Sequence, residues 1–372
     1  MDTTARHAAA QPDRPALIGA DRIITWREMR ELRDRIARGL FGLDLAPGDH
    51  AGIYAANSLE FLLASAGVRA AGAIPVPLNH RLTADEVAYV LDNSDAAVVF
   101  VGDAFLPLVE SIRHRAATVR AWILVGAERR PWASHLTDLI AGSAPEPVDI
   151  PEGQGFGSMI YTAGTTGKPK GARRLGMDVA GTLLRLQALD LADPTHVHLV
   201  AGPLYHSAPN GFAQFAHLCG SAVVVMPKFD PEEALRTIER HRCTSTFMAP
   251  TLLKRIVDLP PDVRGRYDVS SMRVIVVAAA PCPMAVKEAV VAHFGPVLYE
   301  FYGSTELGIN TLLRPEDVLR KPGSCGRAAP GIELAILDDD GRPVAAGQPG
   351  ELHVRHNAGV FDEYYKNAEA TR

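Results

Sequence analysis

The segment from Tyr161 to Gly171 concentrates residue types that bind phosphate. Its eleven residues, YTAGTTGKPKG, include three glycines, three threonines and two lysines. Glycines let backbone N–H groups approach phosphate oxygens, threonine hydroxyls add donors, and lysines offset the negative charge. The segment is not a Walker loop, because Thr162 stands where that pattern needs its first glycine and Pro169 where it needs Ser or Thr. The composition indicates a polyphosphate loop, with a flexible hairpin loop as the alternative.

A second segment, Tyr299–Glu306, places a hydroxyl beside a carboxylate. Its sequence, YEFYGSTE, follows an apolar run and predicts the end of a strand. The pair Thr305 and Glu306 can contact a phosphate and Mg²⁺, a hard cation that takes oxygen ligands. The alternative is that Glu306 is a helix N-terminal carboxylate with a purely local role.

Two shorter strings follow other apolar runs. The small residues of Ala278–Pro283 permit close approach of a flat base to the backbone, although a tight strand-to-helix turn fits them equally well. His206 stands in the string PLYHSAPNG, where a structural histidine is the alternative to a functional one. Neither string identifies a site by itself.

Together these strings resemble, in the expected order, the signatures of the adenylate-forming superfamily. This family includes acyl-CoA and aryl-CoA synthetases, luciferases and peptide-synthetase adenylation domains. The resemblance implies ATP, Mg²⁺ and coenzyme A as co-substrate. The loop that would hold the phosphates comprises Thr162, Ala163, Gly164, Thr165, Thr166, Gly167 and Lys170. Ala163 replaces the usual serine, which removes one neutral donor worth about 0.5–1.5 kcal/mol.

The resemblance also assigns roles outside that loop. Tyr302 would stack on adenine, Thr305 would meet the α-phosphate, and Glu306 would bind the metal. The implied catalytic residues are Thr305, Glu306 and His206. The other implied nucleotide contacts are Ala279, Ala280, Pro281, Glu300, Phe301 and Gly303. The implied substrate pocket comprises His206, Asn210, Gly211, Phe212, Gly303 and Ser304.

The implied reaction is ATP-dependent activation of a carboxylic acid to an acyl-AMP and its transfer to coenzyme A. The segment from Leu199 to Gly220 contains no acidic residue, which disfavours an amino-acid substrate because its ammonium group would be buried without a partner. Phe212 and Phe215 favour a fatty or other apolar acyl chain, with an aromatic acid as the alternative. A non-catalytic nucleotide or acyl-binding module is the alternative from another class.

The elements that must position these residues alternate in type. Helical spacing covers Thr25–Leu43 and Ser58–Ala71, and Thr83 with Glu86 forms a capping-box pattern. Such alternation predicts parallel α/β sheets with ligand sites beyond the strand C-termini. The predicted strands are 51–55, 74–78, 97–101, 121–125, 159–162, 196–200, 222–226, 245–249, 274–277, 297–301, 333–337 and 351–355.

The resemblance covers nearly the whole chain and predicts an N-terminal AMP-binding domain over residues 1–372. We expect two α/β lobes over about 1–325, with mixed and parallel sheets, and a small β-barrel-like lobe over about 326–372. The Pro-, Gly- and Ser-rich stretch 141–154 reads as a surface linker. Family members continue with a lysine-bearing C-terminal domain that this sequence does not include, so we expect poor adenylation by the chain alone.

Composition narrows the remaining function classes. The chain has 372 residues, 47% hydrophobic and 22% charged, as expected for a globular protein, and a net charge of −5 with scattered basic residues, which disfavours nucleic acid. Its four cysteines form no metal-binding pair pattern. The N-terminus lacks a signal-peptide pattern, and no apolar run reaches the roughly 18 residues of a membrane span. We therefore expect a cytoplasmic enzyme, and a homodimer stays open.

Overall fold

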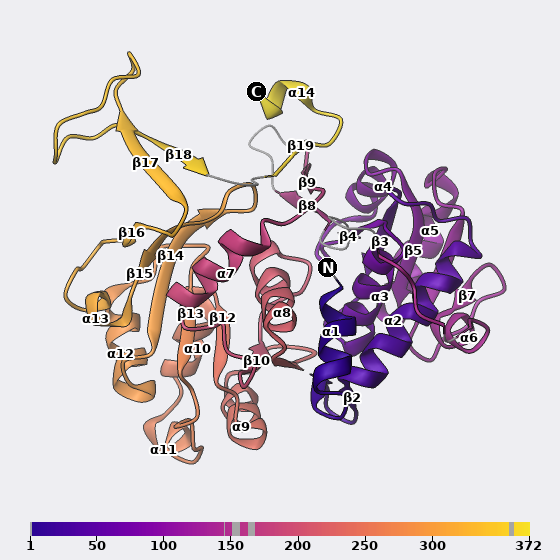
Figure 1. Cartoon of the computed structure of the whole chain (residues 1–372), viewed down its shortest axis with the longest axis horizontal. Helices are drawn as coiled ribbons and strands as arrows, with labels where there is room; N and C mark the ends of the chain where they lie inside the picture. The colour runs from indigo at the N-terminus through magenta and orange to yellow at the C-terminus, as the bar shows by residue number, and fades with distance from the viewer. Residues whose placement is uncertain (1, 145, 151–156, 163–167, 357–360) are drawn as a thin grey trace.

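The computed structural model describes residues 2–372 except 145, 151–156, 163–167 and 357–360. Two large sheets covered by helices make up most of the molecule, and two small sheets lie above them (Figure 1). This mixed α/β architecture confirms the predicted fold class. The division into lobes at about residue 325 stays a prediction.

The larger sheet has nine strands with a parallel centre and antiparallel edges. The central strands are continuous apolar runs such as VIVV in 274–277, because helices cover both faces of a parallel sheet. In sheet order the strands are β16 (Arg327–Ala328), β15 (Gly308–Leu313), β14 (Leu298–Ser304), β13 (Val274–Val277), β12 (Ser245–Met248), β10 (Val197–Val200), β11 (Ala222–Val225), β1 (Pro15–Ile18) and β2 (Ile23–Thr25). The helices that follow in this half are α7 (Val179–Ala188), α8 (Ser207–Cys219), α9 (Pro231–His241), α10 (Pro250–Val257), α11 (Pro261–Arg264), α12 (Met284–Phe294) and α13 (Pro315–Val318).

The second sheet is wholly parallel and belongs to the N-terminal half. Its strands, in order, are β4 (Ile74–Pro77), β3 (His50–Tyr54), β5 (Ala96–Gly102), β6 (Ala121–Val125) and β7 (Ser134–His135). The accompanying helices are α1 (Thr3–Ala10), α2 (Trp26–Phe41), α3 (Leu59–Ala70), α4 (Ala84–Asn93), α5 (Leu106–Ile112) and α6 (Leu136–Ala141), with 3-10 turns at 103–105 and 113–115. The predicted capping box of α4 is present, since Thr83 and Glu86 exchange both hydrogen bonds.

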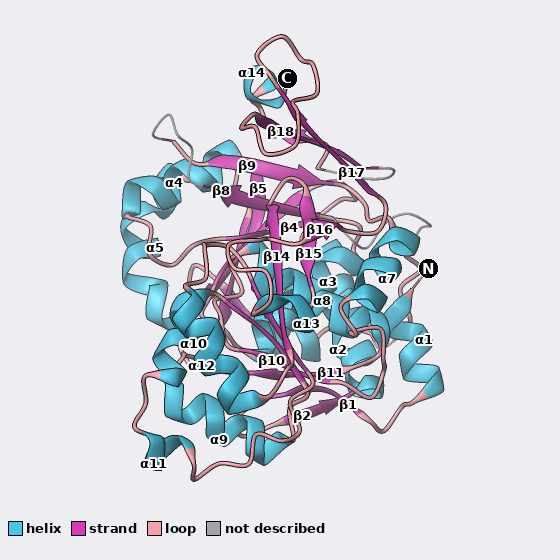
Figure 2. Cartoon of the chain, turned by 90° about the vertical axis from the view of Figure 1, so that its left-hand side faces the viewer, coloured by secondary structure: helices cyan, strands magenta, loops and turns pink. Residues whose placement is uncertain are grey.

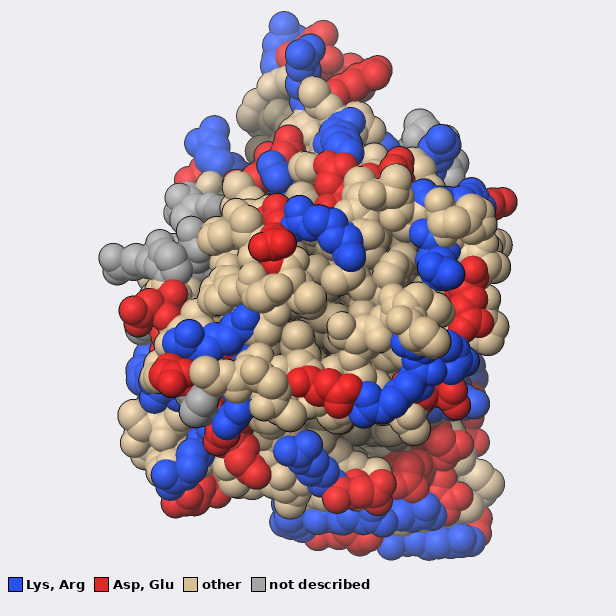
Figure 3. Space-filling model, turned by 90° about the vertical axis from the view of Figure 1, so that its right-hand side faces the viewer, with Lys and Arg blue, Asp and Glu red and all other residues tan. Residues whose placement is uncertain are grey.

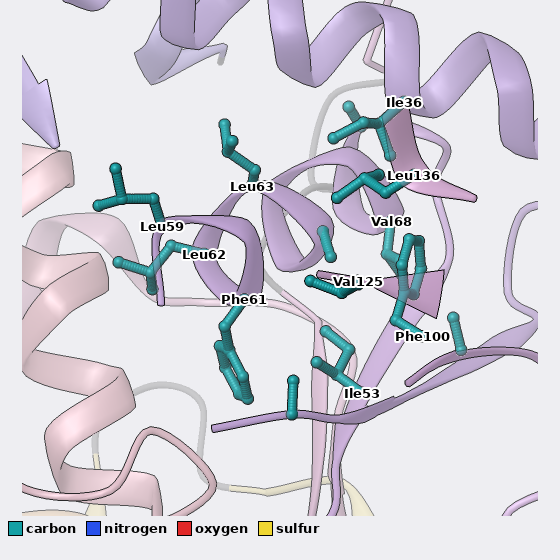
Figure 4. Close-up of a cluster of buried hydrophobic side chains, with 14 of the residues drawn as sticks. Ile36, Ile53, Leu59, Phe61, Leu62, Leu63, Val68, Phe100, Val125 and Leu136 are labelled. Carbon is teal, nitrogen blue, oxygen red and sulfur yellow. The ribbon is translucent and has the colours of Figure 1, made fainter. Parts of the chain in front are cut away.

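The core of this half lies between the sheet and helices α2 and α3. Ile36 from α2, Val68 from α3 and Phe100 from β5 converge there, all fully buried (Figure 4). Burial of a side chain of this size stabilises the fold by roughly 1.5–3 kcal/mol. The sheet is therefore held as a rigid support for the loops at its edge.

Two small sheets complete the described part of the chain. One is antiparallel, in the order β19 (Glu363–Tyr364), β9 (Lys170–Arg174) and β8 (Ser158–Thr162). The other is the hairpin β17 (Ile332–Leu337) and β18 (Glu351–His356), which extends away from the main body (Figures 1 and 2). The short helix α14 (Ala368–Thr371) follows β19.

The predicted strands are confirmed to within a few residues at each end. The sequence prediction did not include the strands β1, β2, β7, β9, β15, β16 and β19. On the face shown in Figure 3, Lys and Arg are interspersed with Asp and Glu around uncharged residues. Among the described residues, no helix is both long enough and apolar enough to cross a membrane.

Candidate functional site

The predicted site residues follow neighbouring strands of the nine-stranded sheet. Strands β14, β13, β12 and β10 are adjacent and parallel, so their carboxyl ends meet at one edge. His206 follows β10, Ala279 follows β13, and Ser304 ends β14. The sheet thus collects three strings that lie far apart in sequence, at the edge where parallel sheets bind ligands.

A cavity of about 360 Å³ opens at this edge. Aromatic and aliphatic side chains form much of its wall, together with a few polar groups, as is usual for small-molecule sites. The predicted site residues that line it are Gly211, Phe212, Ala279, Phe301, Gly303, Ser304 and Thr305. The ring of Phe212 stacks on Phe247 with centroids 5.2 Å apart, which fixes its position in the wall.

Two hydroxyls meet at the cavity surface. Ser207 is the first residue of α8 and Thr305 follows β14, yet their side-chain oxygens lie 3.0 Å apart. Both residues line the cavity. This hydrogen bond joins the histidine string to the second signature. Because one hydroxyl donates to the other, the pair leaves one hydroxyl proton for a ligand.

Glu306 lies beside the small sheet that carries the phosphate loop. Its Oε1 accepts a 2.7 Å hydrogen bond from the hydroxyl of Tyr364, and the ammonium of Lys170 lies 5.4 Å from the centre of the Tyr364 ring. Thr162 pairs with Lys170 at the loop end of the β8–β9 hairpin. One tyrosine therefore contacts residues from both signatures. The intervening loop residues Ala163, Gly164, Thr165, Thr166 and Gly167 lie outside the described residues.

Burial and hydrogen bonding shift the pKa of Tyr364 from its ordinary value. Desolvation raises the pKa to about 12, and the bond to Glu306 adds to this effect. The phenol therefore keeps its proton at neutral pH and remains the donor. Within the part of the chain that the structure describes, Tyr364 bonds only Oε1 of Glu306, which leaves the second carboxylate oxygen to another ligand.

His206 caps the N-terminus of α8 and does not line the cavity. The residue is exposed, with its ring against Tyr205 at a centroid distance of 4.3 Å. Partial desolvation on that side, followed by the charges of Arg81 and His80, lowers the pKa of His206. The imidazole is therefore neutral near pH 7. Its predicted catalytic role stays a prediction.

The string that is predicted to border adenine has an unusual backbone. Ala279 has a φ of +75°, a left-handed conformation that costs an L-residue roughly 1–2 kcal/mol. The next two residues in the chain, Ala280 and Pro281, are exposed. Tyr302, on the neighbouring strand β14, is also exposed, with 48% of its surface accessible. An exposed ring next to small residues is a surface on which a flat base could stack.

Two predicted residues have side chains engaged elsewhere. Glu300 is buried and forms an ion pair with Lys287 of α12, so only its main chain is available to a nucleotide. Asn210 is also buried, donates to the Leu204 carbonyl at 2.8 Å and accepts from Gln214. Its side chain shapes the loop before α8, and the prediction that it lines the substrate pocket has no support from the cavity wall.

Several cavity residues were missed by the sequence prediction. They are Ser158, Ile160, Ala172, Arg174, Met177, Thr182, Arg185, Leu186, Ser207, Ala208, Gln214, Leu307, Gly308, Ile309, His356 and Phe361. Alternation along β8 and β9 could have identified some of them, because every second residue of a strand faces the same side. The residues of α7 carried no comparable signal.

The described residues contain no group of three or more His, Cys, Asp or Glu side chains placed to hold a metal. A metal that arrives with ATP needs fewer protein ligands, because phosphates and water supply most of its oxygens. The single carboxylate of Glu306 fits that arrangement and does not fit a permanent, all-protein metal site.

Known proteins are similar to this chain in both sequence and fold. A family model for AMP-binding enzymes matches residues 4–365. The chain is 31% identical to the indoleacetate–CoA ligase of Aromatoleum aromaticum over 370 residues, which cover 98% of this chain and 71% of the relative. It is 30% identical to the long-chain-fatty-acid–CoA ligase FadD13 of Mycobacterium tuberculosis over 353 residues, covering 94% and 68% of the two chains.

Solved structures agree with this result. The anthranilate CoA ligase AuaEII, solved with anthranoyl-AMP, superposes with a TM-score of 0.92 at 27% identity, covering all of this chain and 72% of that one. The N-terminal domain of FACL13 from Mycobacterium tuberculosis gives 0.89 at 28% identity, with 100% and 92% covered. Fold and site together define an AMP-forming ligase of the acid–thiol class. The chain belongs to the AMP-binding enzyme family.

Proposed function

We propose that this protein activates a carboxylic acid with ATP and passes the acyl group to coenzyme A. A carboxylate oxygen attacks the α-phosphorus, which expels pyrophosphate and leaves an acyl-AMP. The thiol of coenzyme A then displaces AMP. Both partners of the first step are anions, so donors and cations must be held in place before the reaction.

One observation carries this proposal. The hydroxyls of Ser207 and Thr305 meet at 3.0 Å on the wall of a largely apolar cavity, next in sequence to the carboxylate of Glu306. An acid in the cavity would therefore meet a hydroxyl donor at this part of its wall. The β8–β9 hairpin that flanks the proposed phosphate loop contacts the same carboxylate through Tyr364.

Each of the proposed nucleotide-binding residues would contact a different part of Mg-ATP. Lys170 and the loop before it would hold phosphates, Thr305 would donate to the α-phosphate, and Tyr302 would stack on adenine. Glu306 would hold Mg²⁺, which when bound neutralises phosphate charge. His206, neutral at pH 7, would border the passage of the thiol.

The acid itself is proposed to have an apolar body. Phe212, Phe215 and Leu186 line the cavity, whose volume suits an aromatic acid or a chain of moderate length. The relatives named above act on indoleacetate, long-chain fatty acids and anthranilate, so both acid types are represented among them. A cytoplasmic location, a homodimer and the lobe boundary at about residue 325 remain predictions.

The test is acid-dependent release of pyrophosphate. The protein, at concentrations near those of the substrates, is incubated with ATP, Mg²⁺ and each of a panel of fatty and aromatic acids. We expect acyl-AMP by mass spectrometry and, after addition of coenzyme A, the matching thioester. ATP binding by calorimetry without pyrophosphate release from any acid would overturn the proposal in favour of a non-catalytic nucleotide-binding module.

A further inference from the structure

One side of the cavity carries positive charge. Arg174, Arg185 and His356 line this polar side, whereas the apolar rings of Phe212 and Phe215 line another part of the wall. A cavity built only for an alkyl chain has no use for two guanidinium groups, because burying an unpaired charge is costly. Their presence calls for a physical explanation.

The strand register directs Arg174 into the cavity. In the antiparallel β8–β9 pair, Ser158 lies opposite Arg174 and Ile160 lies opposite Ala172. Directly opposed residues and residues two apart share one face of a sheet. All four line the cavity, so the whole face is turned toward it. The side chain of Arg174 thus enters the cavity as a consequence of the pairing.

Arg185 enters from helix α7, which lies beside α8 (Figure 1). Thr182, Arg185 and Leu186 are spaced by three and four residues, share one helix face and all line the cavity. The Arg185 guanidinium donates to the Thr182 hydroxyl at 3.3 Å, which steadies its direction.

Within the described residues, neither arginine has an acidic partner. Arg174 donates to the main-chain carbonyl of Glu306 at 3.2 Å, whereas its neighbour Arg173 forms an ion pair with Glu363. The nearest carboxylates form no ion pair with either arginine and act on them only at longer range. Asp178 accepts from the Gly181 N–H at 3.0 Å, and Asp362 accepts from the Leu175 N–H at 2.7 Å.

A histidine on this wall has one ring nitrogen without a hydrogen-bond partner. His356 lines the cavity, and its Nδ1 is buried with no hydrogen-bond partner among the described residues. Burial lowers the pKa of Arg174 and the charge of Arg185 lowers it further, although the charges of Asp362 and Glu306 oppose this in part. An anion placed between the two guanidinium groups would relieve this repulsion and supply the missing acceptors.

We propose that the cavity selects carboxylic acids that carry a second carboxylate, which pairs with Arg174 and Arg185 while the first is activated. The inference rests on the proposed function and narrows its substrate class from apolar acids to diacids with an apolar middle. Guanidinium groups suit this task, because each presents a planar set of donors that matches a carboxylate.

The experiment compares acids that differ only in the second carboxylate. Hexanoate is paired with adipate, and phenylacetate with 4-carboxyphenylacetate. For each acid, kcat/KM for acyl-AMP formation is measured with saturating ATP and Mg²⁺. We expect the diacid of each pair to be preferred at least tenfold, which is the range of one or two charge-assisted hydrogen bonds.

Substitutions then locate the preference. Arg174→Met and Arg185→Leu should each lower the diacid-to-monoacid ratio by about tenfold to a hundredfold. Arg185→Gln, which keeps polarity and removes the charge, serves if the leucine variant does not fold. Arg240→Met, on the exposed side of α9, is the matched control and should leave the ratio unchanged.

The outcomes separate this inference from the function on which it rests. Turnover of monoacids with no preference for diacids overturns the inference and leaves the proposed function standing. A rise in KM for ATP in both arginine variants, at an unchanged acid ratio, also overturns it, because the arginines would then serve the nucleotide. Failure with every acid, mono or di, counts against the proposed function itself.

Discussion

The hydroxyl of Tyr364 donates to the carboxylate of Glu306 across 2.7 Å, although 58 positions separate the two residues. The same ring lies under the ammonium of Lys170. Strand β19 brings Tyr364 to this place by pairing with β9, where Tyr364 lies opposite Ala172. The last described strand therefore links the two segments that are proposed to bind the triphosphate and its metal.

Replacing Tyr364 with phenylalanine should weaken the use of Mg-ATP. The ring and its contact with Lys170 stay, while the carboxylate of Glu306 loses the donor that orients it. We expect KM for Mg-ATP to rise about threefold to tenfold, since a hydrogen bond to a charged group contributes roughly 1.5–3 kcal/mol when buried and less when partly exposed. Steady-state kinetics at several Mg²⁺ concentrations measure this change.

The adjacent tyrosine is a matched control for that prediction. Tyr365 donates to Asp95 at 2.8 Å, away from Glu306. Tyr365→Phe should leave KM for Mg-ATP unchanged. Equal effects of the two substitutions would mean that β19 acts on stability alone.

The hydroxyl of Thr305 is expected to matter more to the reaction than that of Ser207. Thr305→Val removes the proposed donor to the α-phosphate and should lower kcat for acyl-AMP formation roughly a hundredfold, as for loss of one transition-state donor. Ser207→Ala removes only the 3.0 Å bond that positions Thr305 and should cost less than tenfold. The reverse ranking in single-turnover assays would assign the donor role to Ser207.

The buried ion pair between Lys287 and Glu300 should be sensitive to loss of one partner. Both residues are buried, with accessible fractions of 3% and 8%. Lys287→Met leaves a buried carboxylate without its counter-ion, so we expect the free energy of unfolding to fall by about 3–5 kcal/mol. Urea denaturation followed by circular dichroism measures it.

Two comparisons isolate the cause of that loss. The double variant Lys287→Met with Glu300→Leu should recover most of the stability, because no unpaired charge remains. Lys254→Met breaks the exposed pair with Asp258, whose side chain is 56% accessible, and should cost less than about 1 kcal/mol. A double variant as unstable as the single one would attribute the loss to packing.

Stability should fall as the pH drops below the ordinary pKa of histidine. Burial lowers the pKa of His217 to about 4, while its Nε2 is 3.0 Å from the Ala16 carbonyl. The unfolded chain therefore binds the extra proton more readily, which favours unfolding between about pH 6.5 and 4. We expect His217→Gln to reduce the loss over pH 6.5–4.5 by on the order of 2 kcal/mol.

The measurement is the melting temperature across that pH range. His114 is exposed, so His114→Gln should keep the slope of the wild type. His198, whose pKa burial lowers to about 3, stays in both variants and retains part of the slope. An unchanged slope in His217→Gln would show that groups other than His217 cause the acid sensitivity.

The central strands could be predicted from the sequence because they are short, continuous runs of apolar residues. All four residues of β13 are apolar and buried, and the helix after Thr83 begins with both capping partners in place. Strand β9 was not predicted, since its sequence KGARR carries three charges. It is a strand because β8 and β19 pair with it, and such partners are not visible in a local window.

The candidate site was predictable to a similar degree. Short strings indicated Thr305 and Ala279, which line the cavity. Arg185 and His356 reach the same wall from a helix and a hairpin that only the tertiary fold brings together. Ser207 was overlooked beside His206, although the helix start at that point turns the serine hydroxyl toward Thr305. The sequence motifs thus identified the cavity residues near Thr305 better than the residues that line the rest of the cavity.

The last prediction concerns Ala279, whose left-handed backbone conformation is unfavourable for a residue with a Cβ atom. Glycine adopts a φ near +75° without a steric penalty, whereas alanine pays roughly 1–2 kcal/mol. Glycine also gains freedom in the unfolded chain, which offsets part of this difference. We expect Ala279→Gly to raise the free energy of unfolding by up to about 1 kcal/mol, and Ala278→Gly, one residue earlier on the buried strand end, to lower it by a similar amount. If both variants lose stability equally in urea denaturation, the left-handed turn at the cavity is not strained, and the alanine there needs another explanation.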